Sequence, residues 1–160
     1  MILEKTKKDK ININLKNEME LKFKSKSVNE AFSRIAVAAF VSQLNPTVEE
    51  LSDIKTAVSE AVTNSIVHGY KELDGDIKIK CVIDGNNVLI EIIDYGQGIE
   101  NIKEARKPLY TSKHGDERAG MGFTIMENFM DKLVVESIMG IGTKIIMEKE
   151  IKIESKESNT

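Results

Sequence analysis

Asp94-Tyr95-Gly96-Gln97-Gly98 and Gly120-Met121-Gly122-Phe123 are the two most informative stretches of this 160-residue chain. Two shorter patterns accompany them, Glu60-Ala61-Val62-Thr63-Asn64 upstream and Gly142-Thr143-Lys144 downstream. Each pattern alone occurs by chance in many chains. Their order, their spacing and their placement on predicted elements together indicate a pocket that holds a nucleotide and a metal ion.

The composition predicts one globular domain. Hydrophobic residues make up 41% of the chain and charged residues 31%, and the length suits one domain with a real core but is short for two. We expect this domain over residues 17–150, between an N-terminal extension (1–16) and a polar C-terminal tail (151–160). The formal net charge of −3 offers no broad basic field for phosphates, so direct nucleic-acid binding is not expected.

Cysteine content and hydropathy narrow the class further. The single cysteine, Cys81, cannot form an internal disulfide, and its alternating surroundings predict a small buried hydrophobe. One Cys and two His argue against a structural zinc site. No apolar run approaches the roughly 20 residues needed to span a bilayer, and the N-terminus lacks the apolar core of a signal peptide. A cytoplasmic protein without a membrane partner is therefore expected.

The chain opens with a predicted strand and an amphipathic helix. Met19, Leu21 and Phe23 alternate with charged residues, as in a half-buried strand. Ser27 with Glu30 has the pattern of a capping box, and Pro46 follows the end of the helix. The helix carries apolar residues at helical spacing: Val28, Phe32, Ile35, Ala36, Ala39, Phe40 and Leu44.

A second capping box, Thr47 with Glu50, opens the next predicted helix, and Gly69 suits its C-terminal end. At roughly 100° per residue, Glu60 and Asn64 fall on the side nearly opposite the apolar stripe, and Asp53 and Ala57 share that side. The predicted buried stripe consists of Leu51, Ile54, Val58, Ala61, Val62 and Ser65.

The second half of the chain reads as strands around one further helix. Residues 77–83 and 88–93 form a predicted hairpin whose second strand is central, because it is apolar on both faces. Residues 99–119 read as a long functional loop, 121–130 as a helix, and 133–137 and 143–153 as strands. With few helical crossovers between strands, this order predicts an α+β sandwich in which a mixed, mostly antiparallel sheet carries helices on one face.

Asp94 leaves the central strand directly before two glycines. An ionised carboxylate only accepts hydrogen bonds, so Asp94 could hold the exocyclic amine of an adenine. Gly96 and Gly98 allow backbone angles closed to other residues and a close approach to a ligand. Taken alone, an ordinary Asp-x-Gly turn between strand and loop explains the same residues equally well.

Gly120-Met121-Gly122 lies at a predicted helix N-terminus, where free backbone N–H groups and the helix dipole favour phosphate. A flexible hinge is the alternative. No Gly-Lys-Ser/Thr follows, so the stretch is not a Walker A loop, and because no strand directly precedes the glycines it is not a Rossmann fingerprint either.

Asn64 offers an amide oxygen that could ligate Mg²⁺, an ion that takes few protein ligands beside substrate phosphates. Glu60 lies one helical turn away and could act as a general base toward a hydroxyl or a water. A solvated helix face is the plainer explanation for such a pair. His68, at the margin of this side, reads as a cap or packing residue.

The predicted loop 99–119 contains the polar residues expected of a lid. Thr111, Ser112 and Lys113 precede Arg118, which is two residues from Gly120. A lid cation that reaches a γ-phosphate stabilises charge during phosphoryl transfer. Of Lys113 and Arg118, Arg118 is favoured for this role, and ordinary loop polarity is the alternative.

These motifs resemble those of a known superfamily. Glu60-x-x-x-Asn64, Asp94-x-Gly96-x-Gly98, Gly120-x-Gly122 and Gly142-Thr143 are similar to the N, G1, G2 and final Gly-Thr boxes of the GHKL ATPases, which include gyrase, MutL and the histidine kinases. Within that group, the stretches 37–41, 59–64, 68–70 and 120–130 resemble the anti-sigma factor serine kinases of spore-forming bacteria. The similarity covers about residues 17–150.

The resemblance implies a Bergerat-type ATP-binding fold, binding of ATP or ADP with Mg²⁺, and a homodimer. It also implies two protein partners: a sporulation sigma factor that is held inactive, and an anti-anti-sigma factor that is phosphorylated on serine. By the motif match, Glu60 would be the base, Asn64 the Mg²⁺ ligand, Asp94 the adenine anchor, Arg118 the lid arginine and Thr143 a neighbour of the adenine. Further predicted nucleotide contacts are Gly96, Gly98, Thr111, Ser112, Gly120, Met121, Gly122 and Phe123.

Three other interpretations remain at this point. A non-catalytic module could use the nucleotide to switch its affinity for a partner, although an intact Glu60 argues against this. A related kinase could regulate a stress sigma factor. An ATPase fragment of a histidine kinase lacks support, because the two histidines, His68 and His114, do not lie on a predicted helical hairpin.

Overall fold

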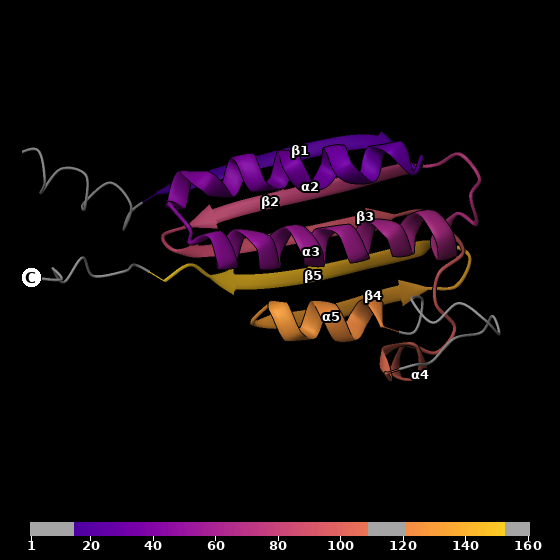
Figure 1. Cartoon of the computed structure of the whole chain (residues 1–160). Helices are drawn as coiled ribbons and strands as arrows, with labels where there is room; N and C mark the ends of the chain where they lie inside the picture. Colours follow the sequence, from indigo (N-terminus) through magenta and orange to yellow (C-terminus); the bar gives the residue numbers. More distant parts are fainter. Residues whose placement is uncertain (1–14, 109–120, 153–160) are drawn as a thin grey trace, which may run out of the picture.

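The computed structural model describes residues 15–108 and 121–152, which form one sheet with a layer of helices on one face (Figure 1). Five antiparallel strands lie in the order β1-β2-β3-β5-β4. Their bounds are β1 Lys16–Lys24, β2 Asp76–Asp84, β3 Asn87–Asp94, β4 Lys132–Ile138 and β5 Gly142–Glu150. The helical segments are α2 Val28–Val41, η1 Ser42–Leu44, α3 Val48–Asn64, η2 Ser65–Gly69, α4 Ile102–Arg106 and α5 Gly122–Phe129.

This arrangement confirms the predicted α+β sandwich. Every strand pair in the described ranges is antiparallel, so the sheet is not mixed. The central position of β3 is confirmed as well, since β2 and β5 flank it. The side chains that point from β2, β3 and β5 toward the helices are fully or almost fully buried, among them Ile79, Ile90, Ile92, Ile145 and Met147. The core therefore lies between this sheet face and the helices.

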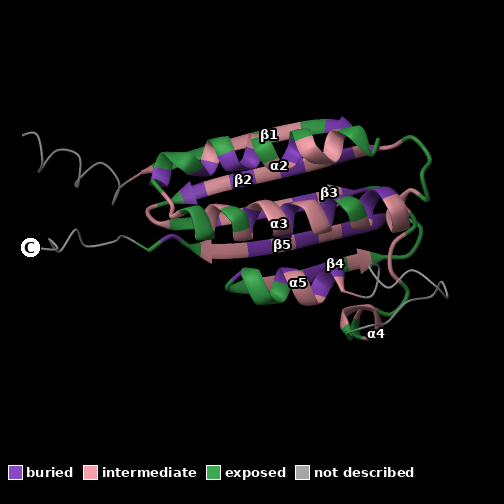
Figure 2. Ribbon diagram, in the orientation of Figure 1, coloured by how far each residue is buried: buried purple, intermediate pink, exposed green. Residues whose placement is uncertain are grey.

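Helix α2 buries a different face from the predicted one (Figure 2). Val28, Phe32 and Ile35 are 76%, 50% and 60% exposed, whereas the buried residues are Ser33, Val37, Ala38 and Val41. Helix α2 packs on α3 as well as on the sheet. Small residues allow that close approach, so they face inward in place of the larger apolar ones.

The two capping-box predictions had opposite outcomes. At the start of α3, Thr47 Oγ1 accepts from Glu50 N at 3.1 Å, and Glu50 Oε1 accepts from Thr47 N at 2.9 Å, as predicted. At α2 the prediction is wrong, because Ser27 has helical backbone angles and makes no side-chain cap. The Glu30 carboxylate instead accepts hydrogen bonds from Arg34 and from Ser59 on α3.

Helix α3 lies between α2 and α5 in the helical layer (Figure 1) and is therefore buried on more than the predicted stripe. Ile54, Val58, Ala61 and Val62 are buried as expected, but Ala57 is also 0% exposed. Placing Ala57 on the polar side was wrong, because periodicity finds one apolar face and does not count the neighbours on either side.

Two further boundaries differ from the prediction. Helix α3 passes into a π-helical turn, Ser65–Gly69, before the chain leaves at Tyr70. Inside the predicted loop 99–119 lies the short helix α4, which the Asn101 side chain caps by accepting from Glu104 N at 3.1 Å. The final strand ends at Glu150, ahead of the predicted end at residue 153.

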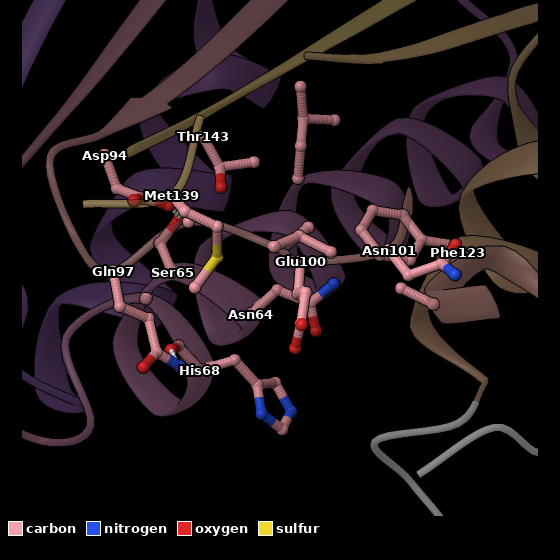
Figure 3. Close-up of a pocket in the computed structure, with 15 residues that line it drawn as sticks. Asn64, Ser65, His68, Asp94, Gln97, Glu100, Asn101, Phe123, Met139 and Thr143 are labelled. Atoms are coloured by element: carbon pink, nitrogen blue, oxygen red, sulfur yellow. Dashed lines mark hydrogen bonds between the residues drawn. The ribbon is translucent and has the colours of Figure 1, made fainter. Parts of the chain in front are cut away.

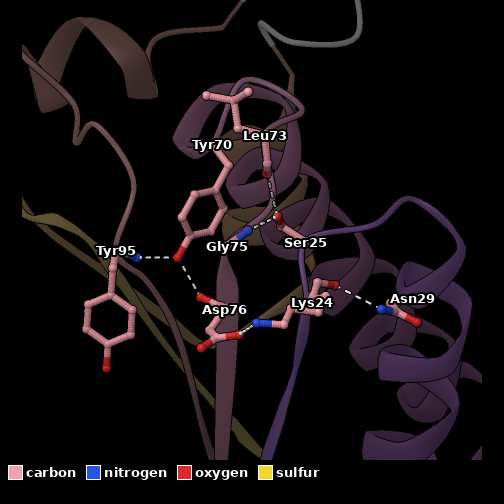
Figure 4. Close-up of polar contacts among 8 residues, drawn as sticks. All are labelled: Lys24, Ser25, Asn29, Tyr70, Leu73, Gly75, Asp76 and Tyr95. Carbon is pink, nitrogen blue, oxygen red and sulfur yellow. Dashed lines mark hydrogen bonds and ion pairs between the residues drawn. The ribbon is translucent and has the colours of Figure 1, made fainter.

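A polar cluster closes the ends of β1 and β2 (Figure 4). Ser25 Oγ donates to the Leu73 carbonyl at 2.8 Å and accepts from Gly75 N at 2.9 Å. The Tyr70 hydroxyl donates to the carbonyl of Asp76 and accepts from Tyr95 N at 2.7 Å. The turn that follows α3 is thus tied both to the sheet edge and to the end of β3.

Candidate functional site

A cavity of about 310 Å³ opens where the end of α3, the exit of β3, the β4–β5 hairpin and the start of α5 meet (Figure 3). Polar residues such as Asp94 and Asn64 line it together with apolar side chains such as Phe123, Met139 and Ile145. Of the residues predicted from sequence to contact a nucleotide, the cavity brings together Asn64, Asp94, Gly98, Phe123 and Thr143.

Asp94 is the buried polar group at the closed end of the cavity. It is 4% exposed and accepts from Ser65 Oγ at 2.8 Å and from Gly96 N at 3.0 Å. Burial raises the pKa of the Asp94 carboxyl, against the opposing effect of these hydrogen bonds and of the Thr143 amide. When ionised, it is an acceptor aimed into a low-dielectric site, which suits an exocyclic amine.

Backbone interlocks build the wall around Asp94. Gly96 has to be glycine, because a Cβ there would lie 2.2 Å from the Gly69 carbonyl oxygen, and Gln97 N donates to that same oxygen at 2.9 Å. The Gln97 side chain donates to the carbonyl of His68 at 2.8 Å. The Asp94–Gly98 stretch is thus fastened to the turn that ends α3.

Thr143 lies beside Asp94 because the two residues are register partners across β3 and β5. Its side chain is largely buried, and its Oγ1 lies 2.8 Å from Ser137 Oγ. Next to it, Gly142 has φ +148°, and a Cβ there would lie 2.1 Å from the Asp94 carbonyl oxygen. The Gly142-Thr143 pattern therefore places a hydroxyl at the closed end of the cavity.

At the end of α3, where the π-helical turn begins, two consecutive side chains reach the cavity. Asn64 and Ser65 are consecutive, yet both line the cavity, and Ser65 reaches Asp94. π-helical turns inside helices are frequently found at functional sites. Sequence reasoning placed Ser65 on the buried stripe and missed its bond to Asp94, because no sequence pattern announces a π-helical turn.

Glu60 and Asn64 face the start of α5. A Cβ at Gly122 would lie 3.2 Å from Asn64 Oδ1 and Nδ2, and 3.4 Å from Glu60 Oε2. Both side chains are half-buried and lie on the side of α3 that the helical spacing predicted. A carboxylate and an amide therefore meet at a helix N-terminus, where anions are favoured.

Part of the predicted site lies outside the described residues. This applies to Thr111, Ser112, Lys113, Arg118 and Gly120, and also to His114. Before that segment in the sequence, Arg106 of α4 forms an ion pair with Glu127 of α5. Met121 precedes α5 without a side-chain cap, and Gly122 and Phe123 begin the helix with both residues buried.

Several cavity residues had no signal in the sequence. Ser137 Oγ accepts from Ile99 N at 2.7 Å, and Met139 reaches the cavity from the β4–β5 turn. Glu100 and Asn101 also line it. In the sequence they are scattered polar or apolar residues, and they meet because the β4–β5 turn packs against the chain around Gly98, where Gly140 N donates to the Gln97 carbonyl at 2.8 Å.

A family model, the histidine kinase-like ATPase domain, matches residues 24–149. An anti-sigma F factor from Clostridium acetobutylicum is 58% identical over 135 residues, which is 84% of this chain and 94% of that protein. One from Clostridium beijerinckii is 56% identical over 140 residues, which is 87% of this chain and 98% of that protein. The chain belongs to the anti-sigma F factor family. The family predicted from the sequence motifs is thereby confirmed.

Solved structures with low sequence identity share the fold. The RsbU and RsbW domains of a Mycobacterium tuberculosis protein match 84% of this chain and 32% of that chain with a TM-score of 0.62 and 17% identity. The catalytic domain of histidine kinase ThkA matches 83% of this chain and 96% of that chain with a TM-score of 0.52 and 16% identity. These matches support the histidine kinase-like ATPase fold.

An ATPase domain of this anti-sigma F factor family implies ATP binding, and the cavity is the place in the described chain that suits it. Membership of the family also implies sigma F as a partner. Among helices in the described ranges, none has the length and apolar character that crossing a membrane requires.

Proposed function

We propose that this protein is an ATP-dependent serine kinase that phosphorylates an anti-anti-sigma factor, and an anti-sigma factor that holds the sporulation sigma factor F inactive. The observation that carries the kinase activity is the placement of Glu60 and Asn64 against Gly122 at the start of α5, with Asp94 at the closed end of the same cavity. The end of the site at Asp94 suits the adenine base of a nucleotide, and the end at Glu60 and Asn64 suits its phosphates. These are called the base end and the phosphate end.

At the base end, the Asp94 carboxylate accepts a hydrogen bond from the exocyclic amine of adenine. Hydrogen bonds from Ser65 Oγ and from the Gly96 amide hold this carboxylate in place. Thr143 lies beside it in the register of β3 and β5. Gly98 and Phe123 also line the cavity. We propose that the triphosphate lies toward α5, where backbone N–H groups at a helix N-terminus favour negative charge.

At the phosphate end, Glu60 acts as the general base. Its carboxylate takes the proton of the acceptor serine hydroxyl while that oxygen forms a bond to the γ-phosphorus, and the bond from that phosphorus to the bridging oxygen breaks to release ADP. We assign to Arg118, Thr111 and Ser112 of the predicted lid, and to Gly120 and Met121, the contacts to the phosphates that their motif positions imply.

Asn64 is the proposed protein ligand of Mg²⁺. Its amide oxygen faces the phosphate end beside the Glu60 carboxylate, and Mg²⁺ takes few protein oxygens when substrate phosphates supply others. When bound, the ion neutralises charge on the phosphates. In the described part of the chain no cluster of three or more His, Cys, Asp or Glu forms a metal site.

The kinase domain is proposed to span residues 17–150, with 1–16 as an extension and 151–160 as a tail. The homodimer and the anti-anti-sigma factor are proposed from the sequence resemblance. A cytoplasmic location accompanies them, since sigma factors act on transcription inside the cell.

A phosphotransfer assay tests the proposal. The full chain is mixed with labelled ATP, Mg²⁺ and the anti-anti-sigma factor of the same organism, beside Glu60→Gln and a control, Glu49→Gln, on the exposed first turn of the same helix. We expect labelled serine with the wild type and the control, and a loss of about a hundredfold or more with Glu60→Gln. Glu60→Gln should still bind ATP.

Two results would change the proposal. Unchanged transfer by Glu60→Gln would remove Glu60 as the base. Absence of label with the wild type, while ATP still binds, would leave a nucleotide-gated binding module. The sigma-factor function has a separate test, co-elution of the chain with sigma F in the presence and absence of ATP, and it fails if no complex forms under either condition.

A further inference from the structure

Ser137 connects three segments of the site without belonging to any of the sequence motifs. It lies near the end of β4 and is the register partner of Thr143 on β5, which is in turn the register partner of Asp94 on β3. The three side chains therefore form one row across neighbouring strands, on the sheet face that carries the cavity. Side chains of directly opposed strand residues are close enough to interact.

The hydrogen bonds of Ser137 are all directed at the nucleotide site. Its Oγ accepts from Ile99 N at 2.7 Å, lies 2.8 Å from Thr143 Oγ1, and lies 3.1 Å from the Gly142 carbonyl oxygen as a possible donor. Ile99 and Thr143 both line the cavity. One hydroxyl thus fastens the end of the Asp94–Gly98 stretch to the start of β5.

The contacts around Ser137 leave little freedom for these segments to shift. Gly98 has φ +81°, and a Cβ there would lie 2.5 Å from the Ile138 carbonyl oxygen. Gly140 N donates to the Gln97 carbonyl at 2.8 Å. Because the β4–β5 turn and the Gly98 turn are packed backbone to backbone, the Ser137 hydroxyl stays within reach of both Ile99 and Thr143.

The single Ser137 proton decides which way the Thr143 hydroxyl points. If Ser137 donates to Gly142, Thr143 donates to Ser137 and presents lone pairs to the cavity. If Ser137 donates to Thr143, the Thr143 proton turns into the cavity. In the second arrangement Asp94 accepts and Thr143 donates, which matches the amine and ring nitrogen of adenine. Guanine has an oxygen and an N–H at those positions and is mismatched.

We propose that Ser137 is a positioning residue that sets the Thr143 hydroxyl as a donor beside Asp94 and thereby selects adenine over guanine. The inference rests on the proposed function in so far as the nucleotide base binds at Asp94. Ser137 itself does not touch the base in this arrangement. It acts through Thr143, so its removal affects base recognition and leaves the phosphate end unchanged.

Nucleotide binding by the full chain tests this, with ATP, ADP and GTP as the probes in calorimetric titrations. For Ser137→Ala we expect ATP and ADP affinities to fall together by about fivefold, the equivalent of one hydrogen bond, while GTP affinity changes by less than about twofold. Ser137→Thr keeps the hydroxyl and should restore the ATP affinity. Ser25→Ala is the matched control, since that hydroxyl also bridges a backbone N–H and a carbonyl but lies outside the cavity.

A double variant tests whether Ser137 affects ATP binding through Thr143. If Ser137 acts through Thr143, Ser137→Ala should have little further effect on ATP affinity in a Thr143→Val background. Should Ser137→Ala not fold, Ser137→Cys replaces it, because a thiol keeps the volume but bonds weakly. The inference is overturned if the variant binds ATP like the wild type, or if ATP, ADP and GTP all weaken by the same factor. If the wild type itself binds no adenine nucleotide, the proposed function fails instead.

Discussion

The two ends of the cavity are built in different ways. At the base end, Asp94 is held by Ser65 and Gly96, and backbone atoms of Gly69 and Gly142 lie against the same stretch. At the phosphate end, Glu60 and Asn64 project from one helix toward the start of another. The base end is therefore a rigid backbone interlock, and the phosphate end is a set of side chains on helix faces.

This difference indicates where the molecule tolerates change. A backbone interlock fails when any added atom forces strands apart, since packed interiors have few voids. Side chains on a helix face can be exchanged for others of similar shape with small effects on the fold. Substitutions that add atoms at the base end should therefore affect stability and binding together, and those at the phosphate end should affect function with little loss of stability.

The largest expected effect is that of Gly142→Ala, which places a Cβ 2.1 Å from the Asp94 carbonyl oxygen. The pairing of β3 with β5 has to open, so we expect a loss of about 3 kcal/mol in the free energy of unfolding and weak ATP binding. Urea unfolding measures it. Gly140→Ala is the control. The φ angle is positive at both glycines, +148° at Gly142 and +79° at Gly140, but no atom lies within 4 Å of a Cβ added at Gly140. A loss of about 1 kcal/mol in the free energy of unfolding is therefore expected. Equal losses would contradict the interlock.

A smaller effect is expected for Asp94→Asn. The amide replaces a buried charged acceptor, so we expect ATP affinity to fall by about thirtyfold, as for the loss of a charge-assisted hydrogen bond. ATP binding by calorimetry measures the change. Since Asn keeps the shape of Asp, the fold should survive, which separates the chemistry of the base end from its packing.

The same variant makes a prediction about pH. Burial raises the pKa of Asp94 above its ordinary value of 3.8, so the folded protein binds that proton more tightly than the unfolded chain. The resulting stabilisation is complete below the ordinary pKa and is lost as the pH rises through the raised pKa. Without nucleotide, Asp94→Asn should therefore gain stability relative to the wild type as the pH rises from the ordinary pKa of 3.8 through the raised pKa of Asp94. A difference that stays constant with pH would contradict this assignment.

The smallest effect is expected on the phosphate side, for Glu127→Gln. This change breaks the ion pair with Arg106. The side chains of Arg106 and Glu127 are 29% and 44% exposed, so the free energy of unfolding should fall by less than about 0.5 kcal/mol. ADP affinity should stay within about twofold, since the base end is untouched. Thermal unfolding and ADP titration measure both. A stability loss as large as that of Gly140→Ala would mean that α4 is part of the rigid frame.

Much of the fold was predictable because its signals are local. The Thr47 capping box, the alternation in β1 and β2, and the glycine-rich stretches each depend on a few neighbouring residues, and the first two are confirmed by the structure. The four motif boxes identified the family, which the comparisons confirm. The roles of Glu60, Asn64 and Arg118 stay predictions, and Arg118 lies outside the described residues.

The wrongly predicted helix faces involve contacts between elements. The buried face of α2 was misread because small residues pack against α3 while Phe32 lies exposed at the sheet edge. Ala57 was misplaced because α3 has neighbours on both sides. In each case the outcome depends on what packs alongside, which periodicity within one segment does not contain.

By itself, the sequence determined the elements, the family and the residue types available for catalysis, because these follow from spacing along one chain segment. Only the tertiary structure decided which of them meet. The row of Asp94, Thr143 and Ser137 exists because antiparallel pairing puts three separate segments in register, and Ser65 joins it because α3 ends in a π-helical turn. Contacts between distant segments depend on the free energy of the whole packed core, so no local pattern specifies them.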